Sequence, residues 1–318
     1  MSPTPARDQA QESLLTVVIA FAANLLVATA KTAAALVTGS ASLVAEAAHS
    51  WVDTANQVFL LVAERRSQRP RDVRHPQGYG KEAYVWSMIA AFGLFTAGAV
   101  LSVQHGIQEL LAPEPASDYP VAYVVLAVSA VIEGVSFVRA YQQARRLARE
   151  RNTGTLEHVI ATSNPTLRAV FAEDSAAMVG LVLAFLGVLL HQLTGSPLFD
   201  ALGSILIGVM LGVVAIILID RNRRFLVGQS IDEATRQLII EQLLLRPDID
   251  RVTYLHMEYV GPDRLFVVAA VDLAGNEPED RLALCLRRLE LDIERHPNVA
   301  EAVLTLSAPG GEDPRTAR

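Results

Sequence analysis

The chain has 318 residues, of which 51% are hydrophobic and 19% are charged, and its mean hydropathy is +0.31. This composition excludes an ordinary soluble domain of the same length and indicates an integral membrane protein. The net charge of −7, with basic residues only in short clusters, does not fit a nucleic-acid-binding surface. A single cysteine, Cys285, excludes both an internal disulfide framework and a CxxC metal or redox motif.

Six apolar segments follow one another along the chain, and each is long enough to cross the hydrocarbon core of a bilayer, about 30 Å thick, as an α-helix. The polar start, Met1 to Glu12, precedes a run too long for the apolar region of a signal peptide, so we expect a short lead into the first span. From Arg221 onward, shorter amphipathic segments predict a soluble domain. We expect spans at residues 14–37, 43–64, 84–111, 120–142, 168–191 and 199–220.

The basic residues set the expected orientation. The loops after the second and fourth predicted spans and the stretch after the sixth are rich in arginine, whereas the three opposite loops contain neither lysine nor arginine. The positive-inside rule therefore predicts cytoplasmic termini and a cytoplasmic soluble domain, and so short a chain of this polarity is expected in a bacterial inner membrane. The predicted domains are a cytoplasmic lead at 1–12, a six-helix transmembrane domain at 13–220, a small α+β domain at 221–307 and a disordered tail at 308–318.

The second predicted span carries ionisable residues in its middle. His49 and Asp53 are four residues apart and therefore share one helical face. The fifth span carries Glu173 and Asp174. Ionisable groups inside a membrane are costly, and a functional role is the default interpretation. One imidazole and two or more carboxylates between the second and fifth spans would suit zinc, and also manganese, cobalt or ferrous iron. Protons bind the same groups, so metal and proton compete.

Other interpretations of these polar residues remain open. His49 and Asp53 also fit a purely structural hydrogen-bonded pair. Glu46, near the outer end of the second span, fits either a solvated or a functional residue. Lys31 of the first span fits either a side chain that extends toward the membrane surface or an ion pair with Glu133 or with an outer acidic residue. An intramembrane metal-dependent hydrolase would use similar ligands, but no HExxH or comparable catalytic motif occurs. A metal sensor that does not transport would have the same site. No catalytic or cofactor-binding residue is predicted.

The soluble region reads as helix, strand, strand, helix, strand. Ser230 is the expected cap of a helix that runs to about Arg246, strands are expected at 251–260 and 265–273, a second helix at 276–295 and a last strand at 300–306. Its ligand-type residues are thinly spread and without metal-site spacing. The candidates for a weak secondary metal site are His256 and His296 in this domain and His75 in the arginine-rich loop, where a capping or packing role is the other interpretation.

Two motifs carry a family resemblance. Thr-Gly-Ser-Ala-Ser-Leu-Val-Ala-Glu-Ala-Ala-His-Ser at 38–50, followed by Asp53 and Asn56-Gln57, resembles the second-span signature of the cation diffusion facilitator family. Arg-His-Pro-Gln-Gly-Tyr-Gly-Lys-Glu at 74–82, with Trp86 just beyond, resembles the loop motif of that family. The resemblance covers about residues 13 to 307, including the six spans and the soluble domain.

The resemblance implies a proton-coupled exporter of divalent cations, usually zinc, that works by alternating access as a homodimer with a metallochaperone-like, ferredoxin-type cytoplasmic domain. Carried over by position, the transport ligands fall on His49, Asp53 and Asp174. The usual fifth-span partner, a His or Asp four residues before the aspartate, is replaced here by Val170, and Glu173 is the nearest candidate for a fourth ligand. Glu173 is rotated by about 100° from Asp174 on a regular helix, so it is expected either to serve through a distorted turn or to pair with a basic residue. In this motif the chain is similar to the branch of the family with a vertebrate mitochondrial zinc transporter.

Overall fold

The computed structural model describes the backbone of residues 6–113, 118–150, 152–275 and 277–308. Side chains are described from Phe21 onward, except that of Ala234 and those in the gaps. Part of the predicted N-terminal lead, residues 1–5, and nearly all of the predicted tail, residues 309–318, lie outside the described residues. The chain divides into two compact units, one formed by residues 1–62 and 86–221 and the other by residues 63–85 and 222–318.

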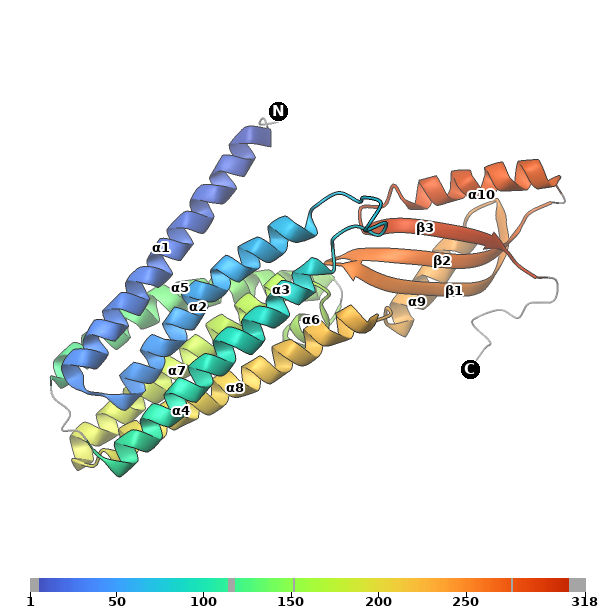
Figure 1. The fold of residues 1–318 in the computed structure, drawn as a ribbon. Helices are drawn as coiled ribbons and strands as arrows, with labels where there is room; N and C mark the ends of the chain where they lie inside the picture. The colour runs from blue at the N-terminus through green and yellow to red at the C-terminus, as the bar shows by residue number, and fades with distance from the viewer. Residues whose placement is uncertain (1–5, 114–117, 151, 276, 309–318) are drawn as a thin grey trace. The chain divides into compact units, whose positions relative to one another are not determined.

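The first unit is helical (Figure 1). All six predicted spans lie in long helical stretches, and one of these passes from α3 through a π-helical turn, η1, into α4 without a break. The short α6 was not predicted. The elements are α1 (Ala6–Thr38), α2 (Ala41–Ser67), α3 (Glu82–Ala90), η1 (Ala91–Phe95), α4 (Thr96–Leu111), α5 (Tyr119–Glu150), α6 (Thr155–Ala161), α7 (Pro165–Thr194) and α8 (Leu198–Val227). The C-terminal ends of α2 and α8 and the start of α3 belong to the second unit.

Within the described residues, five helical stretches are long and apolar enough to cross a membrane: Phe21–Thr38, Glu82–Leu111, Tyr119–Glu150, Pro165–Thr194 and Leu198–Val227. The helix α2 has 27 residues but is too polar in its middle to join them by composition. Its polar side chains Glu46 and His49 are fully buried among the other helices, so they do not face lipid. We therefore count α2 as the sixth span, and the predicted fold class is confirmed.

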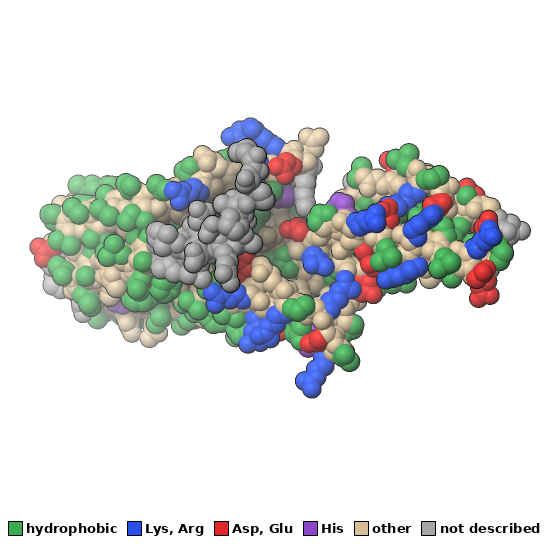
Figure 2. All heavy atoms as spheres, turned by 90° about the horizontal axis from the view of Figure 1, so that it is seen from above, with side chains coloured by type: hydrophobic (Ala, Val, Ile, Leu, Met, Phe, Trp, Pro, Cys, Tyr) green, Lys and Arg blue, Asp and Glu red, His purple; other side chains and the backbone are tan. Residues whose placement is uncertain are grey.

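The outer surface of the helical unit suits a lipid environment. Large apolar side chains such as Leu36, Val131 and Ile216 are exposed, and hydrophobic side chains dominate the surface of this unit in Figure 2. A soluble protein rarely exposes contiguous apolar surface of this kind. The chain is therefore a multi-pass integral membrane protein.

The ends of two helices are fixed by side chains. At the start of α7 the side chain of Asn164 accepts hydrogen bonds from the backbone N–H groups of Thr166 and Leu167, and Pro165 occupies the first helical position, where no N–H is needed. At the start of α2 the carboxylate of Asp200, from α8, accepts the backbone N–H of Ala41 at 2.6 Å. These contacts fix where α7 and α2 begin.

Glycines bring α4 and α8 into close contact. A Cβ atom added at Gly106 of α4 would lie 2.7 Å from the backbone oxygen of Ala201, and one added at Gly208 of α8 would lie 2.8 Å from that of Ala99. No side chain fits at either position without moving the backbone. The two helices therefore pack backbone against backbone.

The second unit contains a three-stranded sheet with two helices. Its elements are α9 (Glu233–Leu244), β1 (Ile249–Gly261), β2 (Arg264–Leu273), α10 (Glu279–Ile293) and β3 (Val299–Leu306). The strand order is β1-β2-β3, with β1 antiparallel to β2 and β2 parallel to β3. Ile240 of α9 and Leu289 of α10 share one core with strand residues such as Val271. The predicted order of elements is confirmed.

One predicted helix cap is wrong. Ser230 pairs with Glu258 in an isolated β-bridge and does not begin a helix. The cap of α9 is Asp232, whose side chain accepts a hydrogen bond of 2.9 Å from the backbone N–H of Thr235. Ser and Asp are equally good caps, so two candidates two residues apart cannot be separated by residue type alone.

Candidate metal site

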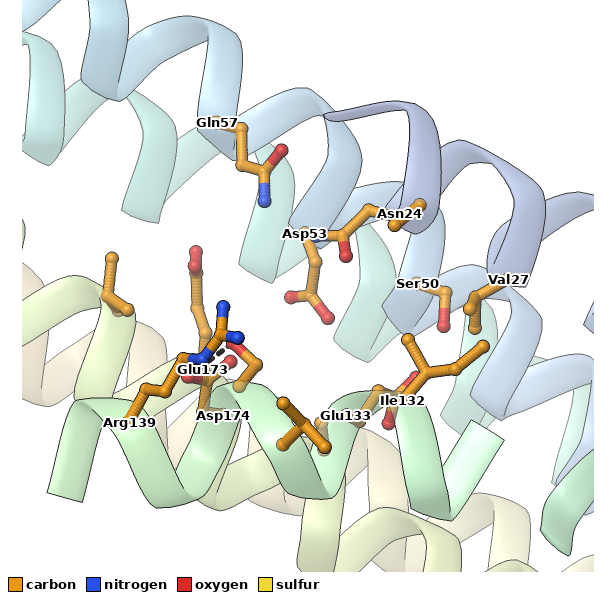
Figure 3. A pocket seen from close by; sticks show the side chains of 15 residues that line it. Asn24, Val27, Ser50, Asp53, Gln57, Ile132, Glu133, Arg139, Glu173 and Asp174 are labelled. Carbon is orange, nitrogen blue, oxygen red and sulfur yellow. Dashed lines mark hydrogen bonds between the residues drawn. The ribbon is translucent and has the colours of Figure 1, made fainter. Parts of the chain in front are cut away.

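A cavity of about 360 Å³ opens among α1, α2, α5 and α7 in the helical unit (Figure 3). Its wall is unusual for a membrane bundle because four carboxylates, from three different helices, line it. The polar lining residues are Asn24, Ser50, Asp53, Gln57, Glu133, Ser136, Arg139, Glu173 and Asp174.

The predicted pair on α2 shares a face, as expected from its spacing. His49 Nε2 lies 3.4 Å from Asp53 Oδ2. The imidazole is fully buried, and among the described residues neither of its ring nitrogens nor Asp53 Oδ1 has a hydrogen-bond partner. Buried polar atoms without partners are costly. A ligand that binds these atoms would remove that cost.

The two acidic residues of α7 both reach the cavity and are held by neighbouring helices. Ser136 of α5 donates a hydrogen bond of 3.0 Å to Asp174. The amide of Asn56, from α2, donates to the buried carboxylate of Glu173. Glu173 therefore reaches the cavity without a distortion of α7, and its described partner is an amide, not a basic residue. Val170, at the position of the missing fifth-span ligand, also lines the cavity.

The predicted ligands approach the cavity from different sides. Figure 3 shows Asp53 extending from one wall toward the wall that carries Glu173 and Asp174. His49 lies beside Asp53 but is not itself part of the lining. Within the described residues, no three His, Cys, Asp or Glu side chains are already close enough together to hold a metal ion. The arrangement is an open acidic cavity and not a closed coordination shell.

An ion-paired lysine lies next to this cavity. Lys31 Nζ of α1 lies 2.7 Å from Glu46 Oε2 of α2 and 2.8 Å from Glu133 Oε1 of α5. Lys31 and Glu46 are fully buried. The expected pair between Lys31 and Glu133 is therefore confirmed, and of the two interpretations of Glu46 the solvated one is wrong. The second carboxylate oxygen of Glu133 is buried without a hydrogen-bond partner, and Glu133 lines the cavity.

Several cavity residues were not predicted as site residues. Asn24 and Gln57 line the cavity from α1 and α2, and Ser136 and Arg139 line it from α5. The spacing of Glu133, Ser136 and Arg139 at intervals of three residues places them on one helical face. That spacing was the available signal in the sequence.

The weak secondary candidates lie apart from one another. The His75 ring nitrogen Nδ1 lies 3.3 Å from Asp72, and its ring lies 4.1 Å from that of Tyr79. His256 is exposed on β1, and His296 accepts a backbone hydrogen bond from Asn298. The structure does not bring these three histidines together as a metal-binding group within the described residues.

Comparison of the sequence with known proteins identifies a family and several relatives. The model of the cation efflux transmembrane domain matches residues 17–227. The chain is 34% identical over 265 residues to Metal tolerance protein C4 of Arabidopsis thaliana, which covers 83% of this chain and 58% of the relative. It is 35% identical over 259 residues to the human mitochondrial proton-coupled zinc antiporter SLC30A9, which covers 81% of this chain and 46% of the relative.

A more distant relative matches over most of its own length. The magnetosome protein MamB of Paramagnetospirillum magneticum is 24% identical over 247 residues, which is 78% of either chain. By contrast, the chain spans about half the length of the plant and human relatives.

Proposed function

We propose that this chain, which belongs to the cation diffusion facilitator family, exports divalent metal ions from the cytoplasm in exchange for protons, with zinc as the favoured cargo. Manganese, iron and cobalt suit the same N and O donors. The observation that carries the proposal is the intramembrane cavity into which Asp53, Glu173 and Asp174 project from α2 and α7, with His49 beside Asp53.

In this proposal the cargo binds between α2 and α7, the second and fifth spans. His49 and Asp53 supply ligands from α2, and Asp174 supplies one from α7. Glu173 is the proposed fourth ligand, because its carboxylate reaches the same cavity, where Val170 has no donor atom. Asp53 and the α7 carboxylates lie on facing walls, so a cation that binds all of them would draw the walls together, which suits alternating access.

The exchange with protons follows from the chemistry of the ligands. A carboxylate or an imidazole binds either a proton or a metal ion through the same lone pair. Metal release toward the acidic side of the membrane would be favoured by protonation of Asp53 and Asp174, and the return of the protonated site would carry protons inward. No additional proton-binding group is required for this cycle.

We further propose a homodimer in a bacterial inner membrane, with both termini and the sheet domain in the cytoplasm. The orientation is supported by the arginine-rich loops after the second and fourth spans, because the opposite loops contain neither lysine nor arginine. The proposed domain boundaries remain at 1–12, 13–220, 221–307 and 308–318.

Two other functions, an intramembrane hydrolase and a metal sensor that does not transport, were left open by the sequence. The matched family and the zinc antiporter relatives are transporters and not enzymes, which argues against an intramembrane hydrolase. A metal sensor would bind zinc at the same residues without moving it. Uptake of zinc into inverted membrane vesicles under an imposed proton gradient distinguishes the two, because only a transporter accumulates the metal.

The test compares the wild type with Asp53→Ala in that assay, repeated with zinc, manganese, iron and cobalt. We expect zinc to be accumulated by the wild type, and the variant to lose accumulation while still inserting in the membrane. Equal uptake by both proteins would refute the transport site.

A further inference from the structure

A second cavity, separate from the transport cavity, lies within the sheet-containing unit. It has a volume of about 320 Å³ and forms where the last residue of α2 and the loop that follows it, residues 67–80, meet β1, β2 and β3. Three arginines and no acidic residue line it. The lining residues are Ser67, Gln68, Arg69, Pro70, Arg71, Gln77, Gly78, Tyr79, Gly80, Val260, Arg264 and Ala300.

The loop that forms one wall is anchored to the sheet at several points. Gly80 packs backbone to backbone on the end of β1, because a Cβ atom added there would lie 2.7 Å from Gly261 Cα. Next to it, Lys81 Nζ lies 2.7 Å from Glu258 Oε1. On the other side, the guanidinium of Arg71 donates to the backbone oxygen of Ala300 on β3. The cavity is therefore a built feature of this unit and not a gap beside a free loop.

The positive charge in the cavity is poorly compensated. Arg71 has a partner in Glu301 at 3.5 Å, but both side chains are more than a third exposed, so the pair is weak. The guanidinium groups of Arg69 and Arg264 have no carboxylate partner among the described residues; Arg69 lies over the ring of Tyr79, 6.0 Å from its centre. Cationic groups held together without counter-charges favour an anionic ligand.

The nearest acidic residue of the loop is already occupied. Asp72 accepts hydrogen bonds from the Tyr79 hydroxyl at 2.6 Å and from the backbone N–H groups of Arg74 and His75 at 2.9 and 2.8 Å. The Tyr79 hydrogen bond, with those from His75 and Arg74, holds the pKa of Asp72 below its usual value. Asp72 therefore makes its hydrogen bonds within the loop, and among the described residues it forms no ion pair with Arg69 or Arg264.

We propose that this cavity binds a phosphate group through Arg69, Arg71 and Arg264. The planar guanidinium presents paired N–H donors that match two phosphate oxygens. A volume of about 320 Å³ accommodates a phosphate together with a small attached group. This site is independent of the metal transport proposed above, since none of its residues lines the transport cavity.

The position of the loop in the chain favours a lipid headgroup as the source of the phosphate. Residues 68–81 connect the end of α2 at Ser67 to the start of α3 at Glu82, and both helices belong to membrane spans. The cavity is thus within a few residues of two points where the chain enters the bilayer. Clusters of lysine and arginine that lie close to a membrane span in the sequence attract anionic lipid headgroups on the cytoplasmic side. A soluble phosphate ester presents the same chemistry and is the second possible source.

The experiment measures hydrogen exchange of the backbone amides of residues 68–81 in the full-length protein. The protein is placed in nanodiscs of phosphatidylcholine alone, in nanodiscs that also contain phosphatidylglycerol, and in phosphatidylcholine nanodiscs with glycerol 3-phosphate added. We expect phosphatidylglycerol to slow exchange in this loop by about tenfold, because a ligand that binds only the closed loop stabilises it by mass action.

Three variants decide the interpretation. Arg69→Gln/Arg264→Gln removes two exposed guanidinium groups that form no ion pair among the described residues, and it should abolish the slowing. Arg69→Lys/Arg264→Lys keeps the charge but loses the paired donors, and it should lose most of the effect. The matched control Arg145→Gln/Arg149→Gln removes the same amount of charge from exposed positions on α5, and its loop should still show the slowed exchange with phosphatidylglycerol.

If hydrogen exchange of the loop is slowed by phosphatidylglycerol but not by glycerol 3-phosphate, the result supports a lipid headgroup. If glycerol 3-phosphate slows the exchange, the result supports a soluble ester at the same arginines. The proposal is overturned if neither additive slows exchange, or if the control variant loses the effect as fully as Arg69→Gln/Arg264→Gln, since that result describes nonspecific attraction to a charged membrane.

Discussion

The ammonium nitrogen of Lys31 lies 2.7 Å from a carboxylate oxygen of Glu46, and neither side chain is exposed. Glu133 adds a second carboxylate to the same nitrogen, so one cation joins α1, α2 and α5. Gly180 of α7 leaves room for this group, because a Cβ atom there would collide with Glu46 Oε1. The network therefore joins three of the helices that line the acidic cavity.

Removal of the lysine tests this role. Lys31→Met leaves the buried carboxylate of Glu46 and the partly buried one of Glu133 without their counter-charge, and we expect a loss of about 3 kcal/mol in the free energy of unfolding. Adding Glu46→Gln to this variant should recover part of the lost stability, because it removes one of the two carboxylates that no longer have a cationic partner. Thermal unfolding of the purified protein in detergent measures both effects. An unchanged unfolding temperature for Lys31→Met would mean that the ion pair does not hold the bundle.

The cap of α2 gives a second prediction. Asp200 accepts hydrogen bonds from the Ser40 hydroxyl at 2.9 Å, from the N–H groups of Ala41 and Ser42 at 2.6 and 3.3 Å, and from the Ser42 hydroxyl. Asp200→Ala leaves these buried donors without an acceptor and should lower the free energy of unfolding by about 2 kcal/mol.

A milder variant serves as the comparison for the cap. Ser42→Ala removes one hydroxyl donor and keeps the carboxylate and both backbone hydrogen bonds, so its unfolding temperature should fall by less than that of Asp200→Ala. The role of Asp200 as the cap is contradicted if the two variants unfold together at the wild-type temperature.

This cap also shows where sequence reasoning stops. The residues Gly-Ser-Ala-Ser at 39–42 are recognisable as part of a family signature, but the carboxylate that binds them comes about 160 residues later, on α8. Hydropathy placed the spans because burial in lipid requires long apolar runs. It carries no information on which polar side chains meet between helices.

The same limit applies to the candidate site. The i,i+4 spacing of His49 and Asp53 predicted a shared face, since helix geometry is local. The hydrogen bond from Asn56 to Glu173 was not predictable, because it depends on how α2 and α7 are rotated against each other. The π-helical turn at Ala91–Phe95 was also missed, because its residues have the same apolar pattern as an α-helix.

The third prediction concerns Glu173 as the fourth ligand. Glu173→Gln keeps the size of the side chain and its contact with Asn56 but removes a negative charge from the cavity, so zinc affinity should fall by about tenfold or more. Asn56→Ala keeps that charge and should change zinc affinity less. Calorimetric titration of zinc into the purified protein measures both. If Glu173→Gln binds zinc like the wild type while His49→Ala does not bind, the site has three protein ligands.

The close approach of α4 and α8 gives a fourth prediction. Gly106→Ala places a methyl group against the backbone oxygen of Ala201 and should destabilise the protein by about 1–3 kcal/mol. Gly93→Ala, in the same span, meets no atom within 4 Å and should be neutral or slightly stabilising. Thermal unfolding of the two variants side by side makes the comparison. Equal stabilities would contradict the backbone contact.

The central claim is an exchange of metal for protons at one acidic site, and proteoliposomes that contain a pH-sensitive dye and a zinc-sensitive dye test it most directly. The matched variants are Asp53→Asn, in the cavity, and Asp250→Asn, an exposed aspartate on β1. We predict that zinc entry and proton exit occur together in the wild type and in Asp250→Asn, and that both are lost in Asp53→Asn. Zinc entry without proton exit in the wild type, or unchanged exchange in Asp53→Asn, would contradict the account.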